Sequence, residues 1–248
     1  MRLKDRVLLV TGAGRNIGAE IARLAAHEGA AVVVVDLDSD RLAGVAKELE
    51  AIRPGSVLPI AADVSRKVDV EMMVARAISK FQRIDVLVNN VAITDRKPLL
   101  ELEEEEWDRV LAVSLKSVYL CSRHVALEMV RTGTRGRIIS IASTSGYRGR
   151  RNATAYTAAK AGILNLTRSM AVQLAQYDIR VNSVTPNKIG SRVGESEERQ
   201  GGTVKNLIGR NGVPRDLANA VLFLAGPESD FITGADLLVD GGALAGLE

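Results

Sequence analysis

The hydrophobic residues of this chain fall into short continuous runs, which alternate with longer stretches where apolar residues recur every three or four positions. The short runs are rich in Val, Ile and Leu, which is typical of parallel strands buried on both faces. They predict seven strands, at Val7–Val10, Ala31–Val35, Val57–Ala61, Ile84–Val88, Arg137–Ile141, Arg180–Val184 and Asp236–Val239. The longer stretches predict helices at Ile17–Glu28, Arg41–Ala51, Val68–Phe81, Glu104–Val130, Ala153–Gln176 and Pro214–Leu224.

This alternation predicts right-handed crossovers within one open sheet. We therefore expect an α/β fold of the doubly wound type, with a seven-stranded parallel sheet and helices on both faces. No linker or repeat interrupts the pattern, so residues 1–248 are predicted to form a single domain. The least regular stretch, residues 187–211, is too long for an ordinary connection. A stretch of this kind is either a functional lid or disordered, and we predict a substrate lid.

Composition narrows the possible functions. The net charge of +3 is too small to indicate a nucleic-acid partner. Cys121 is the only cysteine, which excludes an internal disulfide and a cysteine-based metal cluster, and we predict no metal. Neither histidine, His27 or His124, lies in a loop suited to a Ser-His-Asp hydrolase. No signal segment and no run of about 18 apolar residues is found, so we expect a cytoplasmic protein without a membrane partner.

The first predicted strand ends in a glycine-rich turn, Thr11-Gly12-Ala13-Gly14-Arg15-Asn16-Ile17-Gly18, and a helix follows. Glycines let backbone approach a pyrophosphate, and a helix N-terminus offers free N–H groups to it. Asn16 tolerates a left-handed backbone better than most residues do. A tight strand–helix connection would explain such a turn equally simply, but its place after the first strand of an alternating chain favours a dinucleotide site. The predicted contacts are Gly12, Arg15, Asn16, Ile17 and Gly18.

The second predicted strand leads into Asp36 and Leu37, where the adenosine of a dinucleotide would lie. A carboxylate there accepts hydrogen bonds from the ribose hydroxyls and repels a 2′-phosphate. Arg15 acts in the opposite sense, because a basic residue in the glycine turn attracts that phosphate. Asp36 stands in the ribose contact itself, so we predict NAD as the cofactor rather than NADP. The alternative is that Asp36 merely starts a helix beside Asp38.

Further motifs follow in a fixed order. They are Asp63-Val64, Asn89-Asn90-Val91-Ala92, Ser143, and Ala155-Tyr156-Thr157-Ala158-Ala159-Lys160-Ala161-Gly162. Together with the glycine turn, they resemble the short-chain dehydrogenase/reductase family, and 3-oxoacyl-(acyl-carrier-protein) reductase-like members in particular, over practically the whole chain. The resemblance implies a Rossmann fold. It also implies cofactor contacts at Asp63, Val64, Asn90, Val91, Ala92, Tyr156, Lys160, Pro186, Ile189 and Ser191.

The resemblance further implies a catalytic group. Tyr156 would be the general acid/base, with Lys160 one helical turn away lowering its pKa and holding the nicotinamide ribose. Ser143 would hydrogen-bond the substrate oxygen. Ser114 stands in Val113-Ser114-Leu115, where the family usually has an Asn that helps to relay protons. Ser114 either takes part in that relay or simply bonds to a backbone carbonyl.

The implied activity is the NAD(H)-dependent interconversion of a secondary alcohol and a ketone. Basic residues follow three of the strands, at Arg96, Lys97, Arg148, Arg150, Arg151, Lys188 and Arg192, and favour a small polar or anionic substrate. Ordinary solvated loop charge is an equally good explanation of them. The alternatives are a 3-oxoacyl-(acyl-carrier-protein) reductase that uses NADPH and a non-catalytic NAD-binding regulator or scaffold.

The two long helices at Glu104–Val130 and Ala153–Gln176 carry small and apolar residues on more than one face. A helix of this kind must be buried somewhere. Because members of the family commonly pair these helices between subunits, we expect a homotetramer, with a homodimer as the second choice.

Overall fold

The computed structural model describes residues 1–190 and 206–246. Its strands form one sheet in which all neighbours are parallel, in the order β3-β2-β1-β4-β5-β6-β7. The predicted α/β fold with a seven-stranded parallel sheet is confirmed. The strands are β1 (Val7–Thr11), β2 (Ala31–Asp36), β3 (Val57–Ala61), β4 (Val86–Asn89), β5 (Arg137–Ile141), β6 (Arg180–Pro186) and β7 (Asp236–Val239).

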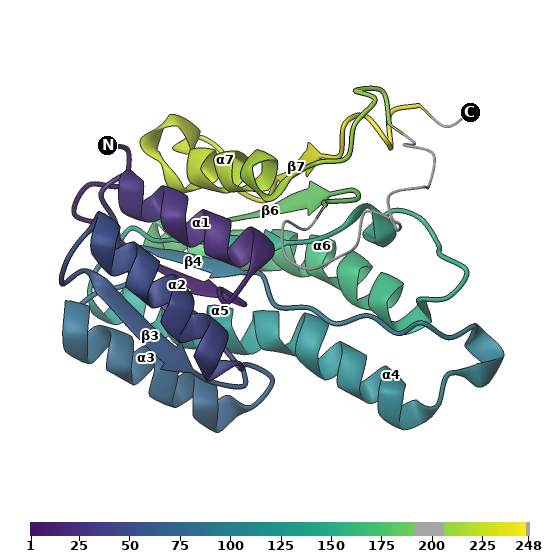
Figure 1. Cartoon of the computed structure of the whole chain (residues 1–248), viewed down its shortest axis with the longest axis horizontal. Coiled ribbons are helices and arrows are strands. Elements are labelled where there is room, and N and C mark those ends of the chain that lie inside the picture. The colour runs from purple at the N-terminus through teal and green to yellow at the C-terminus, as the bar shows by residue number, and fades with distance from the viewer. Residues whose placement is uncertain (191–205, 247–248) are drawn as a thin grey trace.

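Helices cover both faces of the sheet (Figure 1). The α-helices are α1 (Asn16–His27), α2 (Ser39–Ile52), α3 (Lys67–Phe81), α4 (Glu104–Leu111), α5 (Ser117–Arg131), α6 (Thr154–Leu174) and α7 (Pro214–Ala225). Short 3-10 turns are η1 (Leu99–Glu101), η3 (Thr144–Gly146), η4 (Ala175–Tyr177) and η6 (Pro227–Ser229).

The two faces of the sheet make two separate cores, because successive strand residues point to opposite sides. Val10, Val34 and Val88 pack with α1, α2 and α7 on one face. On the other face, Leu9 and Val33 pack with α3, α5 and α6. Strands β1, β2 and β4 are therefore apolar at every position except the last, which explains their continuous hydrophobic runs in the sequence.

The strand order reverses between β1 and β4, which are neighbours in the sheet although they are distant in the chain. In open α/β sheets a crevice forms at such a switch point, beyond the C-terminal ends of the strands. The glycine turn after β1 and the segment after β4 flank this point. The topology therefore places the predicted cofactor and catalytic motifs at one edge of the sheet.

The helix predicted at Glu104–Val130 is divided in the structure. Helix α4 ends at Leu111, a π-helical turn (η2) spans Ala112–Lys116, and α5 continues from Ser117. A π turn inserts an extra residue into a helix and is frequent at functional sites.

By length and composition alone, the run Glu104–Arg131 could cross a membrane, and 50% of its most apolar window is buried inside the fold.

The segment predicted as a lid, residues 187–211, is described only at its two ends. These ends meet: the Gly190 N–H donates to the Gly212 carbonyl at 2.8 Å, and the Gly212 N–H donates to the Lys188 carbonyl at 3.1 Å. Residues 191–205, which include the predicted contact Ser191 and the basic Arg192, lie outside the described residues. The described residues on the two sides of this gap therefore lie side by side just after β6.

Candidate active site

A cleft of about 690 Å³ opens beyond the C-terminal ends of β1, β2 and β4. Most of the predicted cofactor contacts line it. They are Gly12, Arg15, Asn16, Ile17, Asp36, Leu37, Asp63, Val64, Asn90, Val91 and Ala92. We call this space the nucleotide cleft. Seven further residues line it that were not predicted as cofactor contacts, namely Val35, Asp38, Arg41, Ala62, Ile93, Arg109 and Val113.

The glycine turn has the tight geometry that its sequence predicts. Gly12 and Asn16 have φ values of 65° and 50°, so Asn16 adopts the left-handed backbone expected of it. A Cβ on Gly18 would overlap the Gly12 carbonyl, which explains why a glycine is needed there. Arg15 precedes α1 and gives its first turn no side-chain cap. This end of α1 therefore suits a phosphate, because a helix N-terminus attracts anions.

Asp36 lies at the end of β2 against the glycine turn. One carboxylate oxygen accepts from the Gly14 N–H at 2.8 Å, and the other accepts from the Asp38 N–H at 3.1 Å. A Cβ on Gly14 would come within 2.9 Å of the carboxylate, so the close approach depends on this glycine. The backbone thus holds the carboxylate on the wall of the cleft, where hydroxyl donors can reach its free lone pairs.

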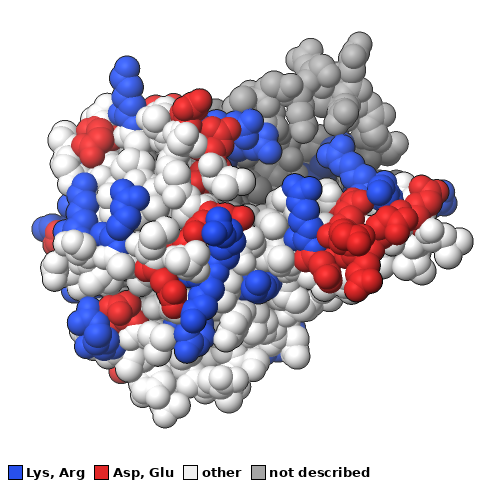
Figure 2. Space-filling view, turned by 90° about the horizontal axis from the view of Figure 1, so that it is seen from below, with Lys and Arg blue, Asp and Glu red and all other residues white. Residues whose placement is uncertain are grey.

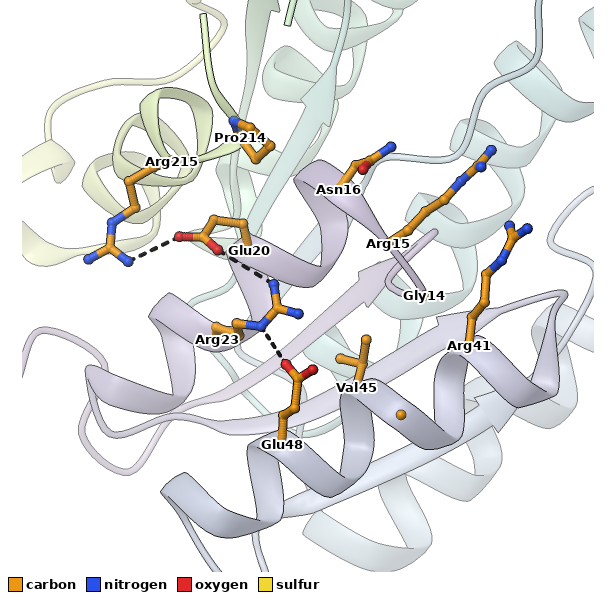
Figure 3. Close-up of a pocket in the computed structure, with 11 residues that line it drawn as sticks. Gly14, Arg15, Asn16, Glu20, Arg23, Arg41, Val45, Glu48, Pro214 and Arg215 are labelled. Carbon is orange, nitrogen blue, oxygen red and sulfur yellow. Dashed lines mark hydrogen bonds and ion pairs between the residues drawn. The ribbon is translucent and has the colours of Figure 1, made fainter. Parts of the chain in front are cut away.

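Two arginines flank Asp36. Figure 3 shows the outer side of the glycine turn, where Arg215 pairs with Glu20 at 3.0 Å and Glu48 pairs with Arg23 at 2.7 Å. Arg15 and Arg41 extend away from these pairs, and both also line the nucleotide cleft. Arg41 forms an ion pair with Asp38, in which Arg41 Nε lies 3.1 Å from Asp38 Oδ2. The end of the cleft beside Asp36 therefore presents both carboxylate and guanidinium groups.

The structure brings Ser143 and Tyr156 together. Ser143 follows β5 and starts η3, where its hydroxyl accepts from the Ser145 N–H at 3.1 Å. Tyr156 belongs to the first turn of α6. Burial raises the pKa of Tyr156 above its ordinary value of 10, while a hydrogen bond with Ser143 and the positive charge of Arg150 lower it. With burial the largest effect, the phenol keeps its proton at neutral pH.

Lys160 lies one helical turn after Tyr156 and is fully buried. Its Nζ donates to the Ile141 carbonyl at 2.6 Å and lies 5.6 Å from the centre of the Tyr156 ring. Burial lowers the pKa of Lys160 from 10.5 to about 7. We expected Lys160 to lower the pKa of Tyr156, but the structure places that effect with Ser143 and Arg150. The reason is that an ammonium group so deeply buried loses part of its charge.

Ser114 lies in the π turn and is completely buried. Its hydroxyl accepts from the Ile93 N–H at 3.0 Å and donates to the Ile93 carbonyl at 2.9 Å. The sequence left two roles open for Ser114, a proton relay and a bond to a backbone carbonyl. The structure shows the bond to a carbonyl, and this carbonyl belongs to Ile93 in the loop after β4 and not to the helix of Ser114 itself. These two bonds join the π turn to the loop after β4.

Comparison with known proteins identifies the family. A family model described as enoyl-(acyl carrier protein) reductase matches residues 12–243. The 3-oxoacyl-(acyl-carrier-protein) reductase FabG of Thermotoga maritima is 37% identical over 245 residues, which cover 98% of this chain and 99% of the relative. The chain belongs to the short-chain dehydrogenase/reductase family.

Other members of the family are similar over nearly their whole length. The cis-4-hydroxycyclohexanecarboxylate dehydrogenase of Sinomonas cyclohexanicum is 38% identical, with 97% of each chain covered. A crystal structure of NAD⁺-bound xylitol dehydrogenase superimposes with a TM-score of 0.90 at 28% identity, covering 98% of this chain and all of that one. This chain is thus an oxidoreductase of a family that includes dehydrogenases acting on alcohols.

Not every residue predicted for this dehydrogenase/reductase site lies in the nucleotide cleft. Ile189 lines a separate cleft of about 420 Å³ beside β7 and α7, and Pro186 is buried at the end of β6. Asn187, which replaces the glycine usual in the family, accepts from the Thr144 hydroxyl at 3.2 Å. This bond ties the segment after β6 to the turn that carries Ser143.

The basic residues predicted to favour an anionic substrate, which we call the basic rim, are not all available to a ligand. Lys97 pairs with Glu106 at 3.0 Å, which raises the pKa of Lys97. Figure 2 shows acidic side chains gathered at the end of the molecule that carries α4. Arg150 differs, because its charge acts on the Tyr156 phenol. Of these basic residues, as far as the structure describes them, Arg150 is the one whose charge lowers the pKa of Tyr156.

Proposed function

We propose that this protein is an NAD(H)-dependent oxidoreductase that interconverts a secondary alcohol and a ketone, with Tyr156 as the general acid/base. Its substrate is a small polar or anionic hydroxy or keto compound. The proposal is supported by one observation: Ser143 follows β5 and lies together with Tyr156 of α6, at the same end of the sheet as the nucleotide cleft. Neither of these residues nor Lys160 is among the described residues that line the cleft itself.

The described residues fit a nicotinamide dinucleotide. The uncapped end of α1 suits the pyrophosphate, and the Asp36 carboxylate suits the ribose hydroxyls. Repulsion between Asp36 and a 2′-phosphate favours NAD. When bound, the nicotinamide supplies hydride chemistry, so the residues of the chain have only a proton to move.

In the reducing direction, the Tyr156 phenol donates its proton to the oxygen of the substrate carbonyl. The raised pKa of Tyr156 suits this role, because the phenol is protonated at neutral pH. The Ser143 hydroxyl donates a hydrogen bond to the same oxygen and stabilises the charge that develops there. Lys160, with a pKa of about 7, exchanges a proton near neutrality and helps to restore the phenol.

Arg150 supports an anionic substrate. Arg150 is exposed, and its positive charge lowers the pKa of Tyr156, so a carboxylate drawn to this guanidinium would lie within electrostatic reach of the phenol. The similarity to a dehydrogenase of a hydroxycyclohexane carboxylate agrees with this chemistry.

A paired substrate assay tests the function. We expect kcat/KM for 4-oxocyclohexanecarboxylate with NADH to exceed that for cyclohexanone at least tenfold, because only the former offers a carboxylate to Arg150. We also expect the Michaelis constant for NADH to be lower than that for NADPH. Equal values for the two ketones would refute the anionic substrate, and a lower Michaelis constant for NADPH would refute the role of Asp36.

A second candidate is a 3-oxoacyl-(acyl-carrier-protein) reductase that uses NADPH. Arg15 and Arg41 favour it, because two guanidinium groups at the adenosine end of the cleft suit a 2′-phosphate. The similarity to the Thermotoga maritima enzyme points the same way. The comparison of NADH with NADPH separates the two candidates directly.

We also propose that the protein is a homotetramer, with a homodimer as the second choice. Large apolar side chains are exposed on α5 (Tyr119, Leu127 and Val130), on α6 (Val172) and on β7 (Leu238). Apolar faces on both the helical layer and the edge strand favour two different contacts between copies. Light scattering is expected to give four times the mass of one chain, and the mass of a monomer would contradict both assemblies.

A further inference from the structure

Asp95 makes a contact across the site that neither the motifs nor the proposed mechanism requires. It lies in the loop after β4 and is only 1% exposed. One carboxylate oxygen accepts from the Tyr156 N–H at 2.9 Å, and the other accepts from the Ala155 N–H at 3.1 Å. A buried carboxylate thus holds the backbone of the residue proposed as the general acid/base.

These bonds replace a cap that α6 lacks. The residue before the helix is Ala153, which has no side-chain oxygen, and no side-chain cap is found there. The N–H groups of the first turn have no partner within a helix and need an acceptor. Asp95 supplies two acceptor oxygens from 60 residues earlier in the chain, and its negative charge is favourable at a helix N-terminus.

The same loop is fixed a second time, two residues earlier. Ile93 is held through both its N–H and its carbonyl by the Ser114 hydroxyl. Val91, Ala92 and Ile93 line the nucleotide cleft. Asp95 therefore joins the wall of the cleft to the turn of α6 that carries the phenol, and Ser114 joins that wall to the π turn.

We propose that Asp95 is a positioning residue: its carboxylate sets the Tyr156 phenol relative to Ser143 and to the nucleotide cleft. The inference rests on the proposed function of Tyr156. A carboxylate that bonds two neighbouring N–H groups fixes both the start and the rotation of the first helical turn. Without it, the turn frays and the phenol loses its defined place, although the rest of α6 remains packed on the sheet.

A merely structural cap would affect stability alone, so the test compares two buried carboxylates that lie on either side of β4 in the chain. Asp85 precedes β4 at the opposite edge of the sheet, where it accepts from the Val7 N–H at 2.9 Å and pairs with Arg6 and Arg83. Asp85→Asn is the matched control, because it weakens a buried carboxylate without touching the cleft.

We expect Asp95→Ala to lower kcat for 4-oxocyclohexanecarboxylate at least tenfold, with the Kd for NADH unchanged within twofold. Asp95→Asn, which keeps one acceptor oxygen, is expected to lower kcat about threefold. Asp85→Asn is expected to lower Tm but to leave kcat within twofold. A wild-type kcat in Asp95→Ala, or an equal loss of kcat in Asp85→Asn at an equal loss of Tm, would overturn the proposal. If Asp95→Ala does not fold, Asp95→Asn decides, and wild-type turnover in it overturns the proposal.

Amide hydrogen exchange tests the contact between Asp95 and the first turn of α6 without the need for a substrate. In Asp95→Ala, amide exchange is expected to accelerate in a peptide covering residues 153–160 and to stay unchanged in one covering 117–131. Unchanged exchange at 153–160 would overturn the proposal. Should the wild-type protein reduce no ketone with either nucleotide, the proposed function fails, while the exchange data still decide whether Asp95 holds this turn.

Discussion

Replacing Tyr156 with Phe is expected to lower turnover about a thousandfold and to leave NADH binding within twofold of the wild type. The substitution removes the phenolic proton that we assign to the substrate oxygen, and general acid–base groups contribute roughly 10²- to 10⁴-fold to rate. The ring remains, so its packing in the first turn of α6 is kept. Steady-state kinetics with 4-oxocyclohexanecarboxylate and a fluorescence titration with NADH measure the two quantities.

Tyr177→Phe is the matched control for this experiment. Tyr177 lies in η4, beyond the far end of α6, and is 46% exposed. Tyr177→Phe also removes a tyrosine hydroxyl but does not change the cleft, so its turnover should equal that of the wild type. Turnover of Tyr156→Phe within fivefold of the wild type would contradict the role of the phenol.

Lys160→Met is expected to stabilise the nucleotide-free protein, by an amount that falls as pH rises. The pKa of Lys160 is lowered from 10.5 to about 7 by burial. Below pH 7 the ammonium is charged in both the folded and the unfolded chain, so the folded state bears the whole cost of burying the charge. Above pH 7 the folded state releases the proton and the unfolded state keeps it up to about pH 10.5, so the cost declines.

The size of this pH dependence follows from the difference between the pKa of Lys160 in the folded and in the unfolded chain. One pKa unit corresponds to about 1.4 kcal/mol, so the advantage of Lys160→Met in the free energy of unfolding should shrink by roughly 3 kcal/mol between pH 6 and pH 9. Urea unfolding at these two pH values measures it. Lys80→Met is the control, because Lys80 also donates to a backbone carbonyl, that of Val57 at 2.7 Å, but lies at the surface. An advantage independent of pH would show that Lys160 is not buried as described.

The sequence predicted the sheet well, because β1, β2 and β4 are buried on both faces and are apolar at every position except the last. Val33 and Val34 point into different cores, and each needs a hydrophobic side chain. The tight geometry of the glycine turn was also predictable, since it depends on residues close together in the chain. Asp36 was predicted from its place at the end of a strand, although its bond to the Gly14 N–H spans 22 residues. The left-handed conformation of Asn16 follows from the properties of that residue alone.

Contacts between distant segments could not be predicted in this way. The π turn at Ser114 has no local sequence signal, because it depends on the Ile93 backbone, 21 residues away. Asp95 has the appearance of an ordinary loop carboxylate until α6 is placed against it. The effect of Lys160 on the pKa of Tyr156 was expected from the family resemblance and from the positive charge of the lysine. That expectation did not include the burial of Lys160, which lowers its own pKa to about 7. Arg41 carried one usable signal, since it lies in the first turn of a helix that starts just after Asp36.

The central claim is that this chain transfers a hydride between a nicotinamide nucleotide and a carbonyl carbon, with Tyr156 supplying the proton. The most direct measurement is the reduction of 4-oxocyclohexanecarboxylate by the wild-type protein with NADH that carries deuterium at the transferable C4 position. We predict that deuterium appears at the carbinol carbon of the product, and that Tyr156→Phe abolishes this transfer under the same conditions. Product without deuterium, or equal transfer by the two proteins, would contradict the account.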